Sequence, residues 1–402
     1  MILVEEAEKI IFSRIKDFGT ESISFENSLN RVLSEDLVTD RDLPPFNRAT
    51  LDGIAIDYAS FEKGVHSFKI NGIQAAGGAS IEIYHDGECI EIMTGAALPG
   101  SANTVIGYED LEIKNEIATI KSGSFKKGNG IHYQGTDKRE NDIIAKSGQL
   151  ITPVIISIAA AIGKANLLVK RLPKAVIISS GDELVDVHET PGPYQIRRSN
   201  SYMIRAALER LNLHPDVLHI PDDPEVTKQN IGDSLQNYEV IILSGGISMG
   251  KFDYIPAALE ELSVEKLFHK VRQRPGKPFW FGQHKNGVLV FALPGNPVAT
   301  YMCVTRYVIP WVKACLGLPS TNNRVAVLKE DFSFTPSLQY FLQVKLNMAP
   351  DGRLWATPFE GNGSGDFANL EEADAFMELP LERNNFTKGE VFTIWPFKEI
   401  LL

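Results

Sequence analysis

Apolar residues repeat with a helical period at the start of the chain and with a strand period soon after. In "MILVEEAEKIIFSRIKDFG" the apolar positions of the helical pattern are Val4, Ala7, Ile10, Ile11 and Ile15. With acidic residues between them, they predict an amphipathic helix that ends at Gly19 rather than a signal peptide. From about residue 55 to 135, short alternating segments broken by glycine, such as "ECIEIMTG" and "LEIKNEIATIKSG", predict a small β-rich unit.

Helical character returns after this unit, in "SGQLITPVIISIAAAIGKA". Thr152 can cap this helix, Pro153 suits its first position and Gly163 suits its exit. Its apolar stretch is too short to span a bilayer. A β-rich unit with helical chain on both sides predicts an insertion into a first domain.

Strands and helices alternate from residue 174 to about 318. "KAVIISSGDE", "DVLHIPDD", "YEVIILSGG" and "VLVFALPG" read as strands, with amphipathic segments between them and a long helix from Pro297 to Leu316. This order predicts a parallel sheet covered by helices on both faces. Residues 322 to 402 return to strand patterns and predict a small barrel or sandwich.

A chain of 402 residues is too long for one hydrophobic core and suggests two to four domains, and the segment patterns divide it into four regions. Residues 1–45 and 136–172 form an elongated helical and extended first domain, and residues 46–135 form the inserted β-rich domain. Residues 173–320 form a doubly wound α/β domain, and residues 321–402 form a small C-terminal β-barrel. The predicted fold class is therefore multidomain α/β.

Composition and charge exclude several kinds of protein. Hydrophobic residues make up 44% and charged residues 23% of the chain, as in ordinary soluble globular proteins. A net charge of −11, without a basic patch interleaved with aromatics, argues against nucleic acid or a membrane as partner. Cys89, Cys303 and Cys315 are far apart and show no CxxC spacing, so we expect neither disulfides nor a zinc site, and a cytoplasmic location.

Three glycine-bearing segments follow predicted strands of the α/β region: "SSGDEL" (179–184), "SGGISMGKFDY" (244–254) and "ALPGNPVA" (292–299). Each alone is equally well explained as a tight turn before a helix cap. Because ligands bind outside the carboxyl ends of strands in an open α/β sheet, the three together predict a pocket. Glycine turns expose N–H groups that favour anions, so Asp253 beside one of them is either a helix cap or a metal ligand.

Carboxylates gather at these predicted strand ends. They are Glu183, Asp222, Asp223 and Asp253. Such a set fits Mg²⁺ shared with a phosphate, because Mg²⁺ takes a few protein oxygens and keeps substrate oxygens and waters. For Asp223 the competing interpretation is a helix cap before "PEVTKQ".

A cationic cluster lies in "FHKVRQRPGKPFWFG" (268–282). If this segment is extended, Lys270, Arg272 and Arg274 share one face, and Lys277 follows. The alternative is a solvated edge strand. The "PGKP" sequence favours oxyanion binding, because a lysine held between prolines is poorly placed to be a mobile surface charge.

Three loops of the first half also carry polar residues beside glycine or charge. Asp52 precedes Gly53, Thr94 precedes Gly95, and Arg139 and Asp142 lie in "GTDKRENDIIAKSGQ". In isolation each loop is more often a turn than a site.

Together these stretches resemble the molybdopterin molybdenumtransferase family, that is, MoeA and the E domain of gephyrin. "PPFNRATLDGIAID", "IMTGAALPGSANTVIGYED", "SSGDEL", "SNSYM", "SGGISMGKFDY", "RPGKPFWFG" and "LPGNPVA" follow in the family's order along nearly the whole chain. The resemblance implies an elongated four-domain homodimer whose α/β domain is of the molybdopterin-binding type. It also implies Mg²⁺-dependent insertion of molybdate into adenylyl-molybdopterin, with release of AMP, and an adenylyltransferase as a candidate partner.

The resemblance implies a role for each residue that falls on a functional position of the family. The implied catalytic residues are Asp52, Thr94, Asp142, Glu183 and Asp253, and the implied metal ligands are Glu183, Asp222 or Asp223, and Asp253. The implied substrate-binding residues are Arg139, Ser180, Asn200, Ser244, Gly245, Gly246, Ser248, Lys270, Arg274, Lys277, Pro294, Gly295, Asn296 and Pro297. The chain departs from the family at Asp137, which replaces a basic residue, at Arg274, which replaces lysine, and at Leu51 and Ile54, which replace Met and Tyr.

Two other classes of function stay open at this point. One is a binding or scaffold protein that uses the same fold without turnover. The other is a nucleotidyltransferase or hydrolase acting on another pterin or nucleotide, because fold alone does not fix function. Release of AMP from adenylyl-molybdopterin, with Mg²⁺ and molybdate present, separates the three.

Overall fold

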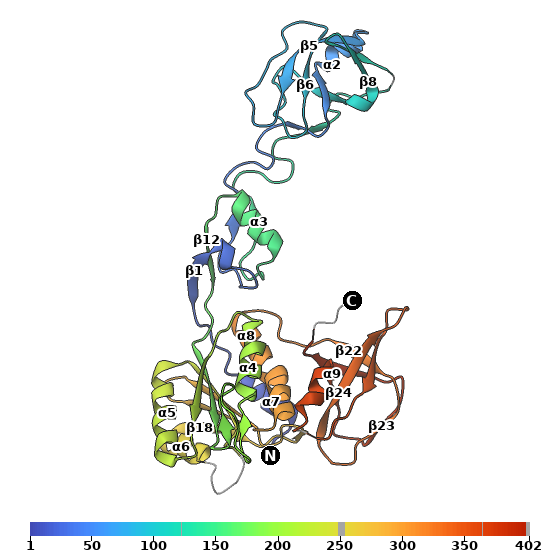
Figure 1. The fold of residues 1–402 in the computed structure, drawn as a ribbon. Helices are drawn as coiled ribbons and strands as arrows, with labels where there is room; N and C mark the ends of the chain where they lie inside the picture. Colours follow the sequence, from blue (N-terminus) through green and yellow to red (C-terminus); the bar gives the residue numbers. More distant parts are fainter. Residues whose placement is uncertain (122, 248–253, 364, 399–402) are drawn as a thin grey trace. The chain divides into compact units, whose positions relative to one another are not determined.

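The computed structural model describes the chain except residues 122, 248–253, 364 and 399–402 (Figure 1). The chain forms two compact units. Unit 1 comprises Met1–Ser22, Asn30–Val32 and Leu168–Leu402, and unit 2 comprises Ile23–Leu29 and Leu33–Leu167. Strands β1 (Thr20–Ser24) and β12 (Asn166–Lys170) pair where the chain passes between the units. Within the described ranges, no helix is both long and apolar enough to cross a membrane.

Unit 1 contains a six-stranded sheet in the order β16-β13-β17-β21-β20-β18. The strands are β13 (Ala175–Ser180), β16 (Asp216–Ile220), β17 (Val240–Ser244), β18 (Val264–His269), β20 (Trp280–His284) and β21 (Leu289–Leu293). The helices around it are α1 (Val4–Phe12), α4 (Asn200–Glu209), α5 (Pro224–Asn237), α6 (Ile255–Glu261), α7 (Pro297–Cys303) and α8 (Ile309–Cys315).

Both faces of this sheet are buried, because alternate residues of its central strands enter different cores. Ile177 and Ile242 pack with residues of α1, α4, α7 and α8. Val176 and Ile241 pack with residues of α5 and α6. Figure 1 shows α5 and α6 on one side of the sheet and α4 and α7 on the other. The predicted doubly wound arrangement is confirmed.

One strand of the sheet, β20, runs against the predicted parallel direction. β20 pairs antiparallel with β21 and with β18. The reason is the short link after His284, where Gly287 has a φ of +91°. A connection of this length joins antiparallel strands, whereas a parallel pair needs a crossover of a dozen residues or more. The sheet is therefore mixed, with parallel strands only where helices intervene.

The predicted long helix after Pro297 forms, but it contains a wide turn. Between α7 and α8 lies a π-helical segment, η3 (Val304–Val308). Pro310 follows it and has no N–H to donate to the carbonyl of Arg306, so the regular α-helical ladder cannot continue through this point. A π-turn is one way in which a helix accommodates such an interruption.

The predicted first helix is shorter than its apolar pattern suggested. α1 ends at Phe12, and Ser13 closes it by donating from Oγ to the carbonyl of Ile10 at 2.7 Å. Ile15, which continues the helical spacing, is 47% exposed. Because Ile15 is only partly buried, it adds little to stabilise another turn, and the helix stops before Gly19.

The C-terminal region is a closed barrel rather than a sandwich. β24 pairs with β25 and with β26, and the remaining pairings complete the ring. The ring consists of β22 (Val325–Leu328), β24 (Gln339–Met348), β25 (Leu354–Pro358), β26 (Ala375–Leu379) and β28 (Val391–Pro396). Outside the ring, β19 (Gln273–Arg274) pairs in parallel with β24, and α9 spans Phe367–Glu372.

Unit 2 contains the predicted β-rich region as a sheet in the order β7-β4-β6-β5-β9-β8. The strands are β4 (Gly53–Ile56), β5 (Ser67–Gln74), β6 (Glu88–Ile92), β7 (Thr104–Gly107), β8 (Leu111–Lys114) and β9 (Ile117–Ile120). Unit 2 also contains α2 (Tyr58–Glu62), α3 (Pro153–Ala161), and two short pairs, β2 (Leu37–Val38) with β11 (Ile143–Ala145) and β3 (Arg48–Ala49) with β10 (Ile131–His132). The cap predicted for α3 is confirmed, since Thr152 Oγ1 accepts from the N–H of Ile155 at 3.4 Å.

Candidate active site

The carboxyl ends of three neighbouring strands lie level in unit 1. β17 pairs in parallel with β13 and β21, and the register places Ser244 opposite Ser179 and Leu293. Glycine turns follow at Gly181, at Gly245 with Gly246, and at Gly295. The predicted convergence of three glycine turns on one sheet edge is confirmed.

Gly245 shows why the edge requires glycine. Its φ of +95° lies in the left-handed region, and its N–H donates to the carbonyl of Leu293 at 3.2 Å. A Cβ atom at this position would lie 3.1 Å from the carbonyl oxygen of Ser180. Any other residue would therefore suffer both backbone strain and a close contact.

Asn200, at the start of α4, ties the turns together. Its Nδ2 donates to the carbonyl of Gly295 at 2.7 Å and to Ser244 Oγ at 3.1 Å. Thr300 Oγ1 donates to the carbonyl of Pro294 and holds the same loop from the other side. Asn296 and Pro297 then begin α7. Asn200 Oδ1 is buried and has no hydrogen-bond partner among the described residues, so it is an available acceptor beside the turns.

The two adjacent aspartates after β16 have different partners. Asp223 Oδ1 accepts from the N–H groups of Glu225 and Val226, both at 2.9 Å, and so caps α5. Asp222 Oδ1 accepts from Ser180 Oγ at 3.0 Å. The structure thus shows the helix cap that was the competing interpretation of Asp223, and it places Asp222 at the strand ends.

Two further acidic residues follow β13. Asp182, which sequence reasoning passed over in favour of Glu183, accepts at Oδ1 from the N–H of Asp222 at 3.0 Å. The carboxylate of Glu183 lies over Gly181, where a Cβ atom would collide with it. Asp253 and Ser248 lie outside the described residues.

The donor chemistry at these strand ends can be tested against Mg²⁺. No group of at least three His, Cys, Asp or Glu side chains that could hold a metal ion occurs in the described part of the chain. Mg²⁺, however, is usually bound by one or two protein carboxylates together with waters and substrate phosphates. Asp222 and Glu183 provide carboxylates of this kind, so the residues present fit such an ion.

The cationic segment does not form one extended strand, so the predicted shared face is wrong. Lys270 has a φ of +71°, which breaks the strand alternation directly after β18. Its N–H donates to the carbonyl of Phe279 at 2.9 Å, and the N–H of Val271 donates to the carbonyl of Lys277 at 2.9 Å. The segment therefore folds back on itself as a turn. We call residues 274–277 the cationic turn; Arg274 and Lys277 are exposed at its two ends.

A cavity of about 280 Å³ lies beside the cationic turn in unit 1. Arg274 and Pro275 form one wall, and the strand β24 and the loop that follows β25 contribute Tyr340, Gln343, Glu360 and Asn362. The Arg274 guanidinium lies over the ring of Phe334, with its carbon 5.8 Å from the centroid. Tyr340 Oη donates to Glu360 Oε1 at 3.1 Å. The cavity is therefore polar, with a cation at its wall.

In unit 2 the structure brings Asp52 and Thr94 together. Asp52 Oδ1 accepts from the N–H of Thr94 at 2.6 Å and from its Oγ1 at 2.8 Å. These bonds, the backbone one first, hold the pKa of Asp52 below its ordinary value, because they stabilise the carboxylate. Two loops that were ambiguous in sequence thus present one exposed polar pair.

Arg139 and Asp142 close a turn of their own. Asp142 Oδ2 accepts from the N–H of Arg139 at 2.8 Å. A nearby hollow of about 570 Å³ is lined by Arg139, Asp42, Gln134, Gly135 and Glu140. Asp42 organises this hollow by accepting from the N–H of Glu140 at 2.9 Å.

Asp137, the departure from the family pattern, has a partner in this structure. Its Oδ1 lies 2.9 Å from His132 Nε2, and the other ring nitrogen lies 3.2 Å from Arg48 Nη2. His132 therefore bridges Asp137 and the guanidinium of Arg48. Ile54, a second departure, is fully buried in the core of the β4 sheet.

Several residues around the candidate site carry no signal in the sequence. Gln273 and Tyr307 are buried polar residues that only packing brings together, and Tyr340, Glu360 and Asn362 come from a barrel without a recognised motif. Asp182 alone had a signal, since it lies in "SSGDEL" beside the residue that was chosen.

Three family models match the chain in order. The MoeA N-terminal region (domains I and II) matches residues 2–163, the probable molybdopterin binding domain matches residues 176–314, and the MoeA C-terminal region (domain IV) matches residues 325–397.

Known proteins are similar over the full length. The chain is 35% identical over 398 residues to the molybdopterin molybdenumtransferase of Synechocystis sp., covering 98% of this chain and 100% of that protein. It is 31% identical over 401 residues to the protein of the same name from Staphylococcus aureus, covering 98% and 95%. A crystal structure of the molybdopterin biosynthesis MoeA protein from Pyrococcus horikoshii covers 99% of both chains, with a TM-score of 0.81 and 30% identity. The chain therefore belongs to the MoeA family of molybdopterin molybdenumtransferases.

Proposed function

We propose that the protein is a molybdopterin molybdenumtransferase, which inserts molybdate into adenylyl-molybdopterin and releases AMP. The observation that carries this proposal is the full-length match to relatives of that name, together with the level strand ends at which the glycine turns and Asp222 meet. The four-domain boundaries predicted from the sequence stay part of the proposal.

The strand ends are proposed to receive the pterin and its phosphates. Their contributors are Ser180, Asn200, Ser244, Gly245, Gly246, Ser248, Pro294, Gly295, Asn296 and Pro297. Asn200 supports this assignment, because it fixes two of the turns and keeps a buried acceptor beside them. Oriented backbone N–H groups in such turns favour anions.

Magnesium is proposed at the same edge. Asp222 and Glu183 would hold it together with Asp253, and bound there it would neutralise charge on the phosphate oxygens. Asp223 stays in the set named from the sequence, although its Oδ1 is engaged in capping α5.

Molybdate is proposed as the ligand of the cationic segment, with Lys270, Arg274 and Lys277 as its donors. The acidic protein needs local positive charge to hold a dianion against its own field. Arg274 supports the assignment, since its guanidinium lines the 280 Å³ cavity. Charge-assisted hydrogen bonds from several donors can replace part of an anion's hydration.

The catalytic test is direct. The purified protein is mixed with adenylyl-molybdopterin, molybdate and Mg²⁺, and AMP is measured. We expect AMP release that requires both molybdate and Mg²⁺. Tight binding of the pterin without AMP would favour a scaffold role, and turnover of other nucleotides in place of this substrate would favour a different transferase or hydrolase.

We also propose a homodimer in which unit 2 of one copy supplies Asp52, Thr94, Arg139 and Asp142 to the site of the other. The support is that both groups are exposed in unit 2 and form built polar turns there. Mixing Asp52→Asn with Lys277→Ala subunits, each nearly inactive at limiting molybdate, should restore about a quarter of the activity, because random mixing gives half heterodimers with one intact site each. No recovery, or a monomer in light scattering, would contradict this.

Two further features belong to the proposal. The three cysteines are unpaired and buried, which supports a reducing, cytoplasmic environment.

Direct handover of the pterin from an adenylyltransferase would be detected as a complex of the two proteins in sedimentation.

A further inference from the structure

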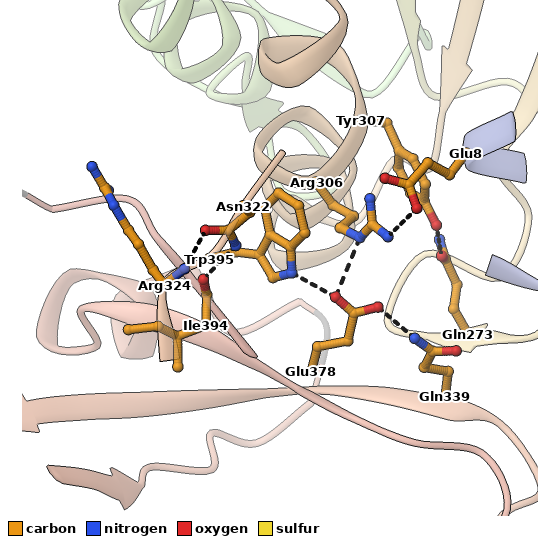
Figure 2. Close-up of polar contacts among 10 residues, drawn as sticks. All are labelled: Glu8, Gln273, Arg306, Tyr307, Asn322, Arg324, Gln339, Glu378, Ile394 and Trp395. Atoms are coloured by element: carbon orange, nitrogen blue, oxygen red, sulfur yellow. Dashed lines mark hydrogen bonds and ion pairs between the residues drawn. The ribbon is translucent and has the colours of Figure 1, made fainter. Parts of the chain in front are cut away.

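The cationic turn rests on a buried polar pair. Gln273, with 0% exposure, donates from Nε2 to the carbonyl of Gly276 at 3.0 Å. Its Oε1 accepts from the hydroxyl of Tyr307, which is also fully buried (Figure 2). Tyr307 thus acts on the turn through one intermediate side chain.

The pair has one orientation only. Tyr307 donates to Oε1, so the amide nitrogen of Gln273 faces the carbonyl of Gly276. A flipped amide would place two oxygen acceptors against each other at that carbonyl. Burial raises the pKa of the Tyr307 phenol, so the hydroxyl keeps the proton it donates.

The turn also packs directly on the helix beneath it. Gly276 has a φ of +90°, and a Cβ atom there would lie 2.8 Å from Cys303 Sγ and from Met302 Cε. The backbone of the turn at Gly276 therefore rests directly on the side chains of Cys303 and Met302. The position of the turn relative to α7 is therefore fixed by these contacts and by the hydrogen bond from Gln273.

The wide turn η3 gives consecutive residues different partners. Tyr307 contacts Gln273, while Arg306 donates to Glu8 Oε2 at 3.0 Å and pairs with Glu378 Oε2 at 3.4 Å (Figure 2). Arg306 is 4% exposed, and its guanidinium carbon lies 4.4 Å from the centroid of the Trp395 ring.

The contacts of Tyr307 and those of Arg306 both lead to the walls of the cavity. Gln339 Nε2 donates to Glu378 Oε1 at 2.5 Å, and Gln339 is the register partner of Gln273 across β19 and β24. The next residue on each strand, Arg274 and Tyr340, lines the cavity. The two neighbouring residues of one helix thus fix the two strand positions that directly precede the cavity walls.

We propose that Tyr307 and Gln273 are positioning residues for the oxyanion substrate: they hold the cationic turn so that Arg274 stays at the wall of the cavity and Lys277 stays at the exposed far end of the turn. Arg306 supports the opposite wall through Glu378 and Gln339. The proposal rests on the proposed function for the identity of the anion, molybdate, but its structural part concerns the turn itself.

The main test uses Tyr307→Phe, which removes one hydroxyl and keeps the ring. We expect the molybdate concentration for half-maximal AMP release to rise on the order of tenfold, because one buried bond that fixes the turn is lost. The maximal rate and the affinity for adenylyl-molybdopterin should stay nearly unchanged, since those depend on the strand ends. The matched control is Tyr238→Phe, which removes a hydroxyl bonded to Asp216 Oδ2 at 2.7 Å near the amino ends of β16 and β17. It should leave the molybdate requirement as in the wild type.

A double variant separates positioning from stability. Replacing both partners by apolar groups, Tyr307→Phe with Gln273→Leu, leaves no unpaired buried group between them and should recover most of the melting temperature lost in the single variant. The molybdate requirement should stay raised, because Gln273→Leu also removes the bond from residue 273 to the carbonyl of Gly276. Recovery of the wild-type molybdate requirement would show that the pair serves stability alone and would overturn the proposal.

Hydrogen exchange tests the same claim without catalysis. The N–H of Val271 donates to Lys277 at 2.9 Å and the N–H of Phe279 donates to Gly276 at 3.2 Å, and both should exchange faster in Tyr307→Phe. Unchanged exchange would overturn the proposal even if the wild type is fully active. If the wild type released no AMP while exchange rose as expected, the proposed function would fail and the positioning role of the pair would stand.

Discussion

The cationic turn of unit 1 and the Asp52–Thr94 pair of unit 2 are both short polar loops, but they are held in opposite ways. The turn is supported from below by Gln273 and Tyr307, which have no exposed surface. The Asp52–Thr94 pair consists of exposed groups that bond to each other, with a carboxylate as the acceptor.

This difference in burial predicts how sensitive each loop is to mutation and to pH. A buried polar group that loses its partner keeps its full desolvation penalty, so the turn should respond strongly to mutation and weakly to pH. An exposed carboxylate is solvated when it loses its partner, so breaking the Asp52–Thr94 bonds should change the stability of unit 2 only a little, whereas the pair should respond measurably to pH. The predictions below test this contrast, from the largest expected effect to the smallest.

Removing the buried Arg306, which pairs with Glu8 and Glu378, should have the largest effect on stability. Arg306→Ala leaves Glu378, whose side chain is 14% exposed, without its cation, and should reduce the free energy of unfolding by about 3–5 kcal/mol. Urea unfolding followed by tryptophan fluorescence measures this, because Trp280, Trp311, Trp355 and Trp395 all belong to unit 1. The control Arg383→Ala breaks a pair whose side chains are 43% and 32% exposed, and should cost less than about 1 kcal/mol. Equal losses would remove the contrast between buried and exposed support.

The adjacent residues Asp222 and Asp223 allow a metal-binding role and a helix-capping role to be compared at the strand ends. Asp222→Ala should lower AMP release on the order of a hundredfold with little change in melting temperature, because a proposed metal ligand is lost. Asp223→Ala should instead lower stability by about 1 kcal/mol, since it removes the cap of α5, and should keep most activity. The two measurements are steady-state AMP release and thermal unfolding, and a reversal of the two phenotypes would reassign the residues.

Lys277 tests the exposed end of the cationic turn. Lys277→Ala should raise the half-saturating molybdate concentration on the order of tenfold, as expected when one charge-assisted donor is removed. Affinity for adenylyl-molybdopterin should hardly change, which calorimetry with each ligand separately measures. Lys285→Ala, an exposed lysine in the turn between β20 and β21, is the control for net charge. Weaker pterin binding with an unchanged molybdate requirement would assign the turn to the substrate phosphates.

The smallest effect is the titration of Asp52. Because its folded pKa is lowered, the Asp52–Thr94 bonds contribute fully above the ordinary aspartate pKa and are lost as the pH falls through the lowered value. Thr94→Val removes the hydroxyl but keeps the backbone N–H, which is the larger cause, so the pKa should rise only part of the way. Carbon-13 NMR of the Asp52 carboxyl follows this titration, and a pKa that returns fully to the ordinary value would mean that the hydroxyl dominates.

Much of the fold was predictable because its signals are local. The strand–helix alternation, the Thr152 cap and the glycine turns after β13, β17 and β21 all follow from backbone requirements of neighbouring residues. The prediction of a helix to Gly19 was wrong because helical spacing of apolar residues does not ensure that each is buried, as Ile15 shows. The prediction of one cationic face was wrong because a single left-handed residue, Lys270, redirects the chain.

What the sequence by itself determined was the family, the order of the folded regions and the polar residues at the strand ends, because motifs and periodicity are properties of contiguous residues. Only the tertiary structure decided which polar residues meet. Gln273 and Tyr307 are 34 positions apart, and Asp52 and Thr94 are 42 apart, so no local pattern pairs them. Tyr307 reaches Gln273 from the wide turn that precedes Pro310, where the helical ladder is interrupted. Both residues are buried where α7 and this wide turn meet the cationic turn. Contacts of this kind depend on how whole elements pack, and packing is not written in any short stretch of sequence.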